Sequence, residues 1–173
     1  MDSLPRFIAD GNVGRLARRL RMLGFDVLFC HPIEDDELVA IAGREGRVLL
    51  TRDTYILHRR VVFGGEVRAL LIARDDVRDQ LRQVVEILGL RPPFAVFSRC
   101  LECNELLSPA SPDEVRDDVP PYVLRTQTSF TRCPRCRRVY WAGTHRGHML
   151  REIQDLDPLN PGGETPSPGD PAR

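Results

Sequence analysis

The stretch RVLLTRD, residues 47–53, is a short apolar run that ends abruptly on Thr51, Arg52 and Asp53. A run of this length that follows a glycine is typical of a buried strand. Near the start of the chain, RFIADGN (residues 6–12) ends its own apolar run on Asp10 in the same way. Each pattern therefore predicts a strand with a carboxylate at or just past its carboxyl end.

Around these two strands, the first half of the chain alternates strand-like and helix-like patterns. DVLFC (residues 26–30) and EVRALLIA (residues 66–73) are typical of further strands, and helices are expected over 13–23, 35–45, 55–60 and 76–88. The expected helix boundaries are Gly24 and Gly46 as stops, Asp35 or Asp36 as one N-cap, and Asp75 or Asp76 as another. Strands joined by crossover helices form a parallel sheet covered on both faces. We therefore expect an α/β domain over about residues 1–95.

The rest of the chain divides by composition. RPPFAVFS (residues 91–98) is the expected junction, because paired prolines stop a helix and begin an extended connection. Residues 96–150 contain paired cysteines and are expected to form a second, smaller domain. Residues 151–173 form a Pro/Gly-rich tail with little to bury, for which disorder is expected.

All 25 basic residues are arginine, which excludes mechanisms that need a Schiff-base, P-loop or general-base lysine. Formal net charge is zero, but residues 119–151 carry seven arginines and no Asp or Glu, so any binding of nucleic acid would be local. No apolar run approaches the length that spans a bilayer, and the N-terminus lacks the pattern of a signal peptide. We therefore expect no membrane partner and a cytoplasmic location.

Acidic residues follow several of the expected strands. In an open parallel sheet, ligands bind beyond the carboxyl ends of the strands, where Asp10 and Asp53 would converge. Asp36, with Asp35 beside it, begins the helix after the second strand at the same edge. Carboxylates crowded together repel one another unless a cation neutralises them, and hard oxygen ligands favour Mg²⁺ or Mn²⁺. Such a site suits hydrolysis of a phosphodiester, although an Asp after a strand is also a common turn or cap residue.

Candidate substrate contacts lie close to these acids in the sequence. Arg15, Arg18 and Arg19 lie on the polar side of the first helix and could hold phosphates through forked hydrogen bonds, although such arginines are often only a solvated face. Thr51 could fix the rotamer of Asp53 by a hydrogen bond, and Arg52 between them is a further candidate contact.

Two C-x-x-C pairs, Cys100 with Cys103 and Cys133 with Cys136, predict a structural Zn²⁺ site with four thiolate ligands. The 29 residues between the pairs exceed the usual spacing, so an insertion containing VPPYVLRTQT (residues 119–128) is expected to loop out or add a strand. The fifth cysteine, Cys30, is expected to be a buried core residue.

Arginines surround the second cysteine pair and adjoin aromatic residues. Arg135 and Arg137, beside Tyr140 and Trp141, could hold single-stranded RNA by phosphate contacts and base stacking, unless the small domain needs those rings for its own core. His145 is a candidate RNA contact and a less favoured acid or base.

Four stretches together resemble the Mut-seven C-terminal ribonuclease domain, a family similar to PIN-like nucleases: residues 7–29, 35–53, 98–107 and 130–145. The resemblance covers about residues 6–149. It implies a PIN-like parallel sheet, metal-dependent cleavage of RNA and an appended zinc ribbon. By position it marks Asp10, Asp36 and Asp53 as the acidic cluster, with Asp35 an adjacent candidate and Asp75 or Asp76 a possible fourth acid.

The sequence therefore predicts a Mg²⁺- or Mn²⁺-dependent ribonuclease acting on single-stranded or structured RNA. The rival hypothesis is a non-catalytic RNA-binding adaptor in which the acids are structural. A haloacid-dehalogenase-type phosphatase would need an Asp where Asn12 stands, and a receiver domain would need a lysine. DNA remains open as a substrate, because metal-bound carboxylates do not read the 2′-hydroxyl.

Overall fold

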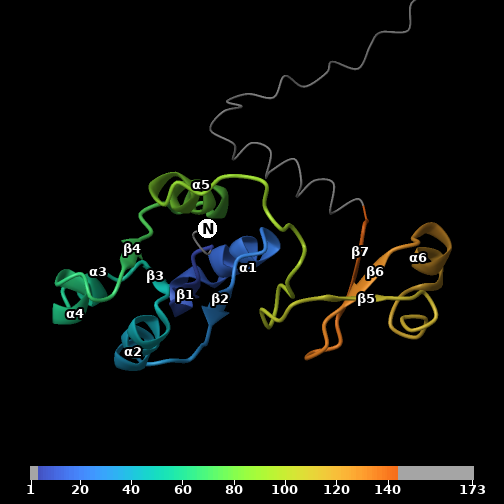
Figure 1. Cartoon of the computed structure of the whole chain (residues 1–173), viewed down its shortest axis with the longest axis horizontal. Coiled ribbons are helices and arrows are strands. Elements are labelled where there is room, and N and C mark those ends of the chain that lie inside the picture. The colour runs from blue at the N-terminus through green and yellow to red at the C-terminus, as the bar shows by residue number, and fades with distance from the viewer. Residues whose placement is uncertain (1–3, 144–173) are drawn as a thin grey trace, which may run out of the picture.

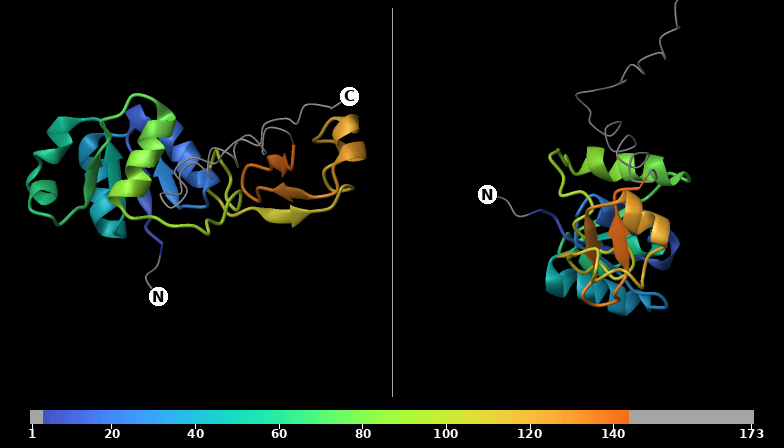
Figure 2. Two further views of the ribbon diagram at one scale, coloured as in Figure 1. Left: turned by 90° about the horizontal axis from the view of Figure 1, so that it is seen from above. Right: turned by 90° about the vertical axis from the view of Figure 1, so that its right-hand side faces the viewer.

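A computed structural model describes residues 4–143 of the chain. It contains a four-stranded parallel sheet flanked by helices and a three-stranded antiparallel sheet, and the two sheets lie toward opposite ends of the molecule (Figure 2). The elements of the larger part are β1 (Phe7–Ala9), the 3-10 turn η1 (Gly11–Val13), α1 (Gly14–Met22), β2 (Val27–Phe29), α2 (Asp35–Glu45), β3 (Val48–Thr51), α3 (Thr54–Leu57), α4 (Arg60–Phe63), β4 (Ala69–Leu71) and α5 (Val77–Ile87). The predicted α/β class is confirmed.

The parallel sheet has the strand order β2-β1-β3-β4 (Figure 1). The chain runs outward from β1 to β2 and then crosses back to pair β3 with the other side of β1, in register at Ala9 and Leu50. The strand order therefore reverses between β1 and β3. In open parallel sheets, ligands bind beyond the carboxyl ends of the strands at such a reversal, which is where Asp10 and Asp53 lie.

Helices cover both faces of this sheet. Phe7 and Ala9 of β1 pack in the core beneath α1 and α5, whereas Ile8 points into the core beneath α2, α3 and α4. In Figure 1, α5 and α2 accordingly lie on opposite sides of the strands. All three β1 side chains are fully buried. Because each face buries alternate residues, the register of β1 is fixed, and with it the position of Asp10 at the strand end.

Most predicted boundaries agree with the structure. Gly24 ends α1 with φ of 93°, and a Cβ there would lie 2.4 Å from the carbonyl oxygen of Ala95. Gly46 ends α2 in the left-handed conformation, and the side chain of Asp76 caps α5. The prediction of one helix over 55–60 was wrong. The chain forms two short helices there, α3 and α4, which are separated between Leu57 and Arg60.

The predicted cap of α2 was also wrong. Its N-cap residue is Glu34, which makes no side-chain cap bond, and both Asp35 and Asp36 lie inside the first turn. Negative side chains there are favourable because they face the positive end of the helix dipole. The two carboxylates therefore remain available to other partners.

The smaller part is built from β5 (Ser108–Ala110), α6 (Pro121–Thr126), β6 (Phe130–Arg132) and β7 (Val139–Trp141), with strand order β5-β6-β7. The insertion between the cysteine pairs adds the strand β5, as expected, but within residues 119–128 the chain forms the helix α6, which was not predicted. Pro121 suits the first turn of a helix, and Val123 anchors the helix in the local core with Phe130. The junction packs back on the larger core through Phe94 and Val96. The domain boundary near residue 95 stays a prediction.

The remaining expectations concern one cysteine and the membrane. Cys30 is exposed, so its predicted burial was wrong; β2 ends one residue earlier, at Phe29. Within residues 4–143, no helix has the length and apolar character needed to cross a bilayer. The C-terminal tail, expected to be disordered, lies outside the described residues.

Candidate active site and cysteine cluster

Asp10 lies directly after β1 and accepts three hydrogen bonds. Its Oδ1 accepts from the backbone N–H of Asn12 at 2.7 Å, which caps η1. Its Oδ2 accepts from the Thr51 hydroxyl and from the backbone N–H of Arg52, the latter at 3.1 Å. The residue is only 5% exposed. An ionised carboxylate has about four acceptor sites, so about one remains for a further partner.

Thr51 connects Asp10 to Asp53. Its hydroxyl donates to the carboxylate of Asp10 and accepts the backbone N–H of Asp53 at 2.9 Å. The predicted hydrogen bond between Thr51 and Asp53 is therefore present, but it joins the backbone of Asp53 and does not fix its rotamer. The Asp53 side chain instead uses its Oδ1 to cap α3 at the N–H of Tyr55, 2.7 Å away. No donor within residues 4–143 bonds its Oδ2. Asp53 therefore keeps an oxygen available beside the strand reversal.

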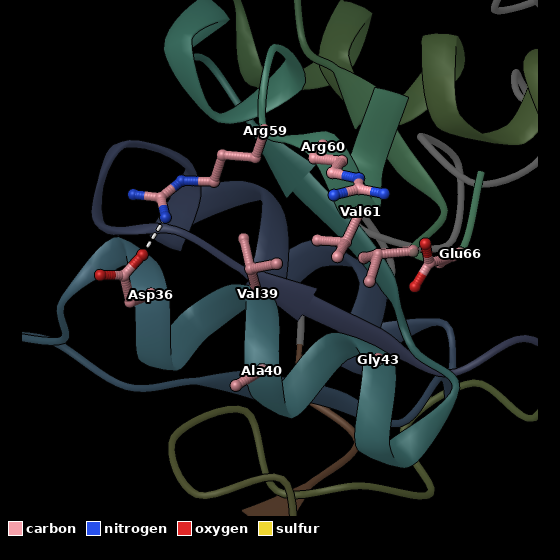
Figure 3. Close-up of a pocket in the computed structure, with 9 residues that line it drawn as sticks. Asp36, Val39, Ala40, Gly43, Arg59, Arg60, Val61 and Glu66 are labelled. Atoms are coloured by element: carbon pink, nitrogen blue, oxygen red, sulfur yellow. Dashed lines mark hydrogen bonds and ion pairs between the residues drawn. The ribbon is translucent and has the colours of Figure 1, made fainter. Parts of the chain in front are cut away.

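Asp36 and Asp35 face an arginine rather than the other acids. Arg59 forms an ion pair with Asp36 (Figure 3). It forms a weaker one with Asp35, at 3.6 Å. The hydrogen bond to Asp36 raises the pKa of Arg59. Arg59 and Asp36 line a cleft of about 510 Å³ between α2 and α4, with Val39 on its wall. A cation of the chain itself thus pairs with both acids and offsets part of their charge.

Within residues 4–143, the four cysteines are the only group of three or more His, Cys, Asp or Glu side chains with ligand atoms within 4.8 Å of one another. Asp10, Asp36 and Asp53 do not approach that closely in this structure. Their assignment as one metal-binding cluster stays a prediction.

The remaining candidates near this edge have protein partners. Arg52 pairs with Asp75 at 2.6 Å, and Asp76 caps α5 by accepting the N–H of Arg78 at 2.8 Å. Both candidates for a fourth acid therefore have a structural reason to be where they are.

The other arginines predicted to contact substrate lie on different surfaces. Three of them, Arg15, Arg18 and Arg19, lie along α1 and line a separate cleft, whereas Arg135 and Arg137 are exposed beside the second cysteine pair. His145 lies outside the described residues.

The four cysteines form a compact group. The Sγ atoms of Cys100 and Cys136 lie 3.5 Å apart, and those of Cys103 and Cys133 lie 3.4 Å apart. Four sulfurs at Zn–S distances of about 2.3 Å form a tetrahedron with edges of about 3.8 Å, whereas a disulfide requires about 2.05 Å. The spacing fits a shared zinc ion and not disulfides, so the predicted ligand set is capable of binding zinc.

Hydrogen bonds prepare one of these thiols for ionisation. The Tyr140 hydroxyl lies 3.1 Å from Cys100 Sγ and accepts the N–H of Leu101 at 3.2 Å. Although burial opposes ionisation, this bond and backbone N–H groups lower the pKa of Cys100 to about 6. Burial and neighbouring sulfurs raise the pKa of Cys103 to about 12. Four thiolates therefore cannot coexist here without a cation, which a bound metal would provide.

Sequence reasoning missed the contacts that hold this cluster against the parallel-sheet domain. Arg21, 4% exposed, donates to the carbonyl of Val27 on β2 and to those of Leu101 and Glu102 in the first cysteine turn, at 2.7–3.0 Å. Asn104 accepts the N–H of Val27 at 2.9 Å. The available signal was the helical spacing, which places Arg21 on the apolar stripe of α1.

One comparison with known proteins identifies a family for this chain. Residues 5–153 match the model of the Mut7-C RNAse domain family. The chain belongs to this family, which associates it with RNA and with a nuclease-like function. No curated protein and no solved structure matches the chain.

Proposed function

We propose that the protein is a metal-dependent ribonuclease whose reaction centre lies at the carboxyl ends of β1 and β3. The observation that carries this proposal is the joint placement of Asp10 and Asp53 at the strand reversal, linked by one threonine hydroxyl. Turn and cap chemistry explains each acid alone but does not require both at this point of the sheet. Membership of the Mut7-C RNAse domain family supports RNA as the substrate.

The donor set fits a hard divalent cation such as Mg²⁺ or Mn²⁺. Among residues 4–143, Asp53 Oδ2 has no hydrogen-bond donor, and Asp10 retains about one acceptor site. Asp36, with Asp35 beside it, would complete the site on release from Arg59. The bound ion would supply activation of water and neutralisation of phosphoryl charge. Thr51 and the backbone N–H groups of Asn12 and Arg52 hold the Asp10 carboxylate in one orientation.

The test is cleavage of end-labelled RNA with Mg²⁺ or Mn²⁺, comparing the native protein with Asp53→Asn. Asn caps helices about as well as Asp, so this variant removes a charge and keeps α3. Asp79→Asn is the charge-matched control, because Asp79 lies in an exposed pair with Arg82 on α5 and is not a candidate of the proposed centre. We expect Asp53→Asn to lose at least about 100-fold in rate, as expected for a lost electrostatic contact, and Asp79→Asn to stay near the native rate.

Asp10→Asn gives a second, less clean test. An amide at this position turns an N–H toward one of three donors, so a thermal melt must accompany its rate. A DNA strand of the same sequence shows whether the 2′-hydroxyl matters. Native cleavage by both folded variants would exclude these acids from catalysis.

An RNA-binding adaptor is the second candidate function, and a specific observation favours it. Asp10 is nearly buried with three donors, and Asp36 is neutralised by Arg59, so both acids already have structural partners. RNA binding without cleavage under Mg²⁺, Mn²⁺ or Ca²⁺ would establish this alternative.

A further inference from the structure

A cleft of about 690 Å³ lies between α1 and the strands β6 and β7 of the smaller part. Arg15, Arg18 and Arg19 of α1 line one part of it, and Tyr140 and Trp141 of β7 line another. These residues are more than 100 positions apart in the chain. The fold therefore brings together the two groups, arginines and aromatic rings, that the sequence presents separately.

The α1 side of the cleft is cationic. Arg15 is exposed and has no ion pair or hydrogen bond within residues 4–143, while Arg18 contacts Glu102 at 2.7 Å with 58% of its side chain exposed. No Asp or Glu is among the described residues that line the cleft. At 1.5 Å per residue, Arg15 and Arg19 are separated by about 6 Å along the helix. The positive charge is thus concentrated over about one helical turn.

The opposite side offers rings held in place by other contacts. The Tyr140 hydroxyl is bound to Cys100 Sγ and to the N–H of Leu101, and Trp141 packs against the small core that contains Phe130. Both rings are nevertheless only half-buried. Rings fixed in this way can stack on a base with little further loss of side-chain freedom.

We propose that this cleft binds a single-stranded segment of RNA, with phosphates on Arg15 and Arg18 and a base against Tyr140 or Trp141. Bases within a duplex are stacked on each other and cannot reach such rings, so the site selects unpaired nucleotides. Arg15 is the second residue of α1, and α1 follows Asp10 through the short turn η1. RNA bound at Arg15 would therefore extend toward the proposed reaction centre. The inference takes RNA as the ligand from the proposed function but does not require cleavage.

Trp141 is the only tryptophan of the chain, so intrinsic fluorescence reports on this cleft directly. The experiment titrates the zinc-loaded full-length protein with a single-stranded RNA oligonucleotide and with its duplex. Mg²⁺ and Mn²⁺ are omitted to prevent cleavage, and chelators are omitted so that the protein retains its zinc. We expect the single strand to quench the fluorescence and the duplex to bind at least about tenfold more weakly. No quenching, or equal affinity for the duplex, would overturn the proposal.

Two variants and one control locate the contacts, with binding measured by the anisotropy of labelled RNA. Arg15→Gln should weaken binding and lower the salt slope by about one unit, as expected for one lost phosphate contact. Trp141→Leu should weaken binding by about fivefold or more. Arg82→Gln, on the exposed face of α5, changes the charge equally and should bind like the native protein. Because Trp141 also packs on a small core, a thermal melt must show that Trp141→Leu is folded. If Trp141→Leu is unfolded, the binding of RNA by Arg15→Gln decides whether the cleft is the binding site.

The outcomes separate this inference from the proposed function. If Asp53→Asn abolishes cleavage and Arg15→Gln binds and cleaves RNA normally, the cleft is wrong and the ribonuclease assignment stands. If the cleft variants behave as expected and no RNA is cleaved, the binding site stands and the protein is an adaptor. If RNA binds without changing the fluorescence of Trp141, and heparin competes with it equally well, the arginines form only a nonspecific basic patch. That result would overturn the proposed cleft.

Discussion

The hydroxyl of Thr51 donates a hydrogen bond to the carboxylate of Asp10 and accepts the backbone N–H of Asp53. Thr51 ends β3 and Asp10 follows β1, so this one fully buried hydroxyl ties together the strands on either side of the strand reversal. A hydroxyl is suited to this position because it can donate and accept at once. The relationship makes Thr51 a positioning residue for both acids.

We therefore predict that Thr51→Val lowers both stability and ribonuclease rate. Valine has nearly the same shape but leaves Asp10 without one donor and the N–H of Asp53 without its acceptor, at a cost of about 1–3 kcal/mol. Urea denaturation at pH 7 measures the loss. Thr51→Ser keeps the hydroxyl and should lie within about 1 kcal/mol of the native protein. Serine loses the threonine methyl group, whereas valine keeps it. Equal destabilisation of the two variants would therefore mean that the hydrogen bonds of the hydroxyl contribute no more to stability than the packing of that methyl group.

Sequence patterns were enough to predict Asp10 and Asp53 as neighbours, because an acid after a buried parallel strand must lie at the carboxyl edge. The hydrogen bond from Thr51 to Asp10 could not be predicted from the sequence. It depends on β3 pairing directly with β1, and the strand order β2-β1-β3-β4 is set by crossovers that leave no mark in any one segment. Local pattern therefore determined which residues lie at the edge, and tertiary order determined which of them touch.

The cases of Arg59 and Arg21 show the same limit from another side. Arg59 lies between two separate short helices, α3 and α4, where the pattern predicted one continuous helix, and from there it pairs with Asp36. Arg21 is buried because backbone carbonyls from residues about 80 positions away surround its guanidinium. An arginine on an apolar stripe is a signal, but its partners come from a part of the chain that sequence spacing does not identify.

Replacing Arg59 should strengthen activation by metal. If Asp36 and Asp35 take part in holding the cation, Arg59→Gln removes the guanidinium that competes for them. Exposed ion pairs are weak, so the Mn²⁺ concentration for half-maximal cleavage should fall by about two- to fivefold. Arg60→Gln, on the same cleft wall, is the control. An unchanged or higher Mn²⁺ requirement in Arg59→Gln would remove Asp36 from the metal site.

The cysteine cluster should hold one zinc ion per chain. We expect one equivalent of zinc to be released on treatment with a thiol-modifying reagent and detected with a colorimetric chelator. Cys136→Ser removes one of the four sulfurs and should release less than half as much after dialysis. Cys30→Ser, which alters an exposed thiol outside the cluster, should release the full equivalent. Equal zinc content in both variants would show that the cluster does not bind the metal.

Arg21 should couple the cysteine cluster to the rest of the molecule. Arg21→Lys keeps the charge but cannot reach the carbonyls of Val27, Leu101 and Glu102 together, because an ammonium lacks the planar fork. We expect a loss of about 2–4 kcal/mol in the free energy of unfolding, together with weaker retention of zinc against a chelator. Arg18→Lys, which replaces a more exposed arginine of the same helix, should cost less than about 1 kcal/mol. Normal zinc retention in a destabilised Arg21→Lys would show that the two parts are not coupled.

Asp26 should make stability depend on acid pH. Its carboxylate accepts from Arg47 at 2.8 Å and from Asn104 at 2.7 Å; burial opposes ionisation, but these bonds, helped by the charges of Arg47 and Arg99, lower its pKa below the ordinary 3.8. Because the folded pKa is the lower one, ionised Asp26 stabilises the fold above about pH 4, and this contribution disappears as the pH falls through the folded pKa.

The stability difference between the native protein and Asp26→Asn should therefore be largest, about 2 kcal/mol, near pH 6–7 and shrink below pH 4. Urea denaturation from pH 3 to 7 measures it. Subtracting the two curves removes effects that both proteins share, such as protonation of the cysteines and of Glu45, whose pKa Arg47 also lowers. Asp79→Asn, in an exposed pair with Arg82, should give a small difference at every pH. A difference for Asp26→Asn that stays constant down to pH 3 would mean that lost packing, and not the ionised carboxylate, accounts for the effect.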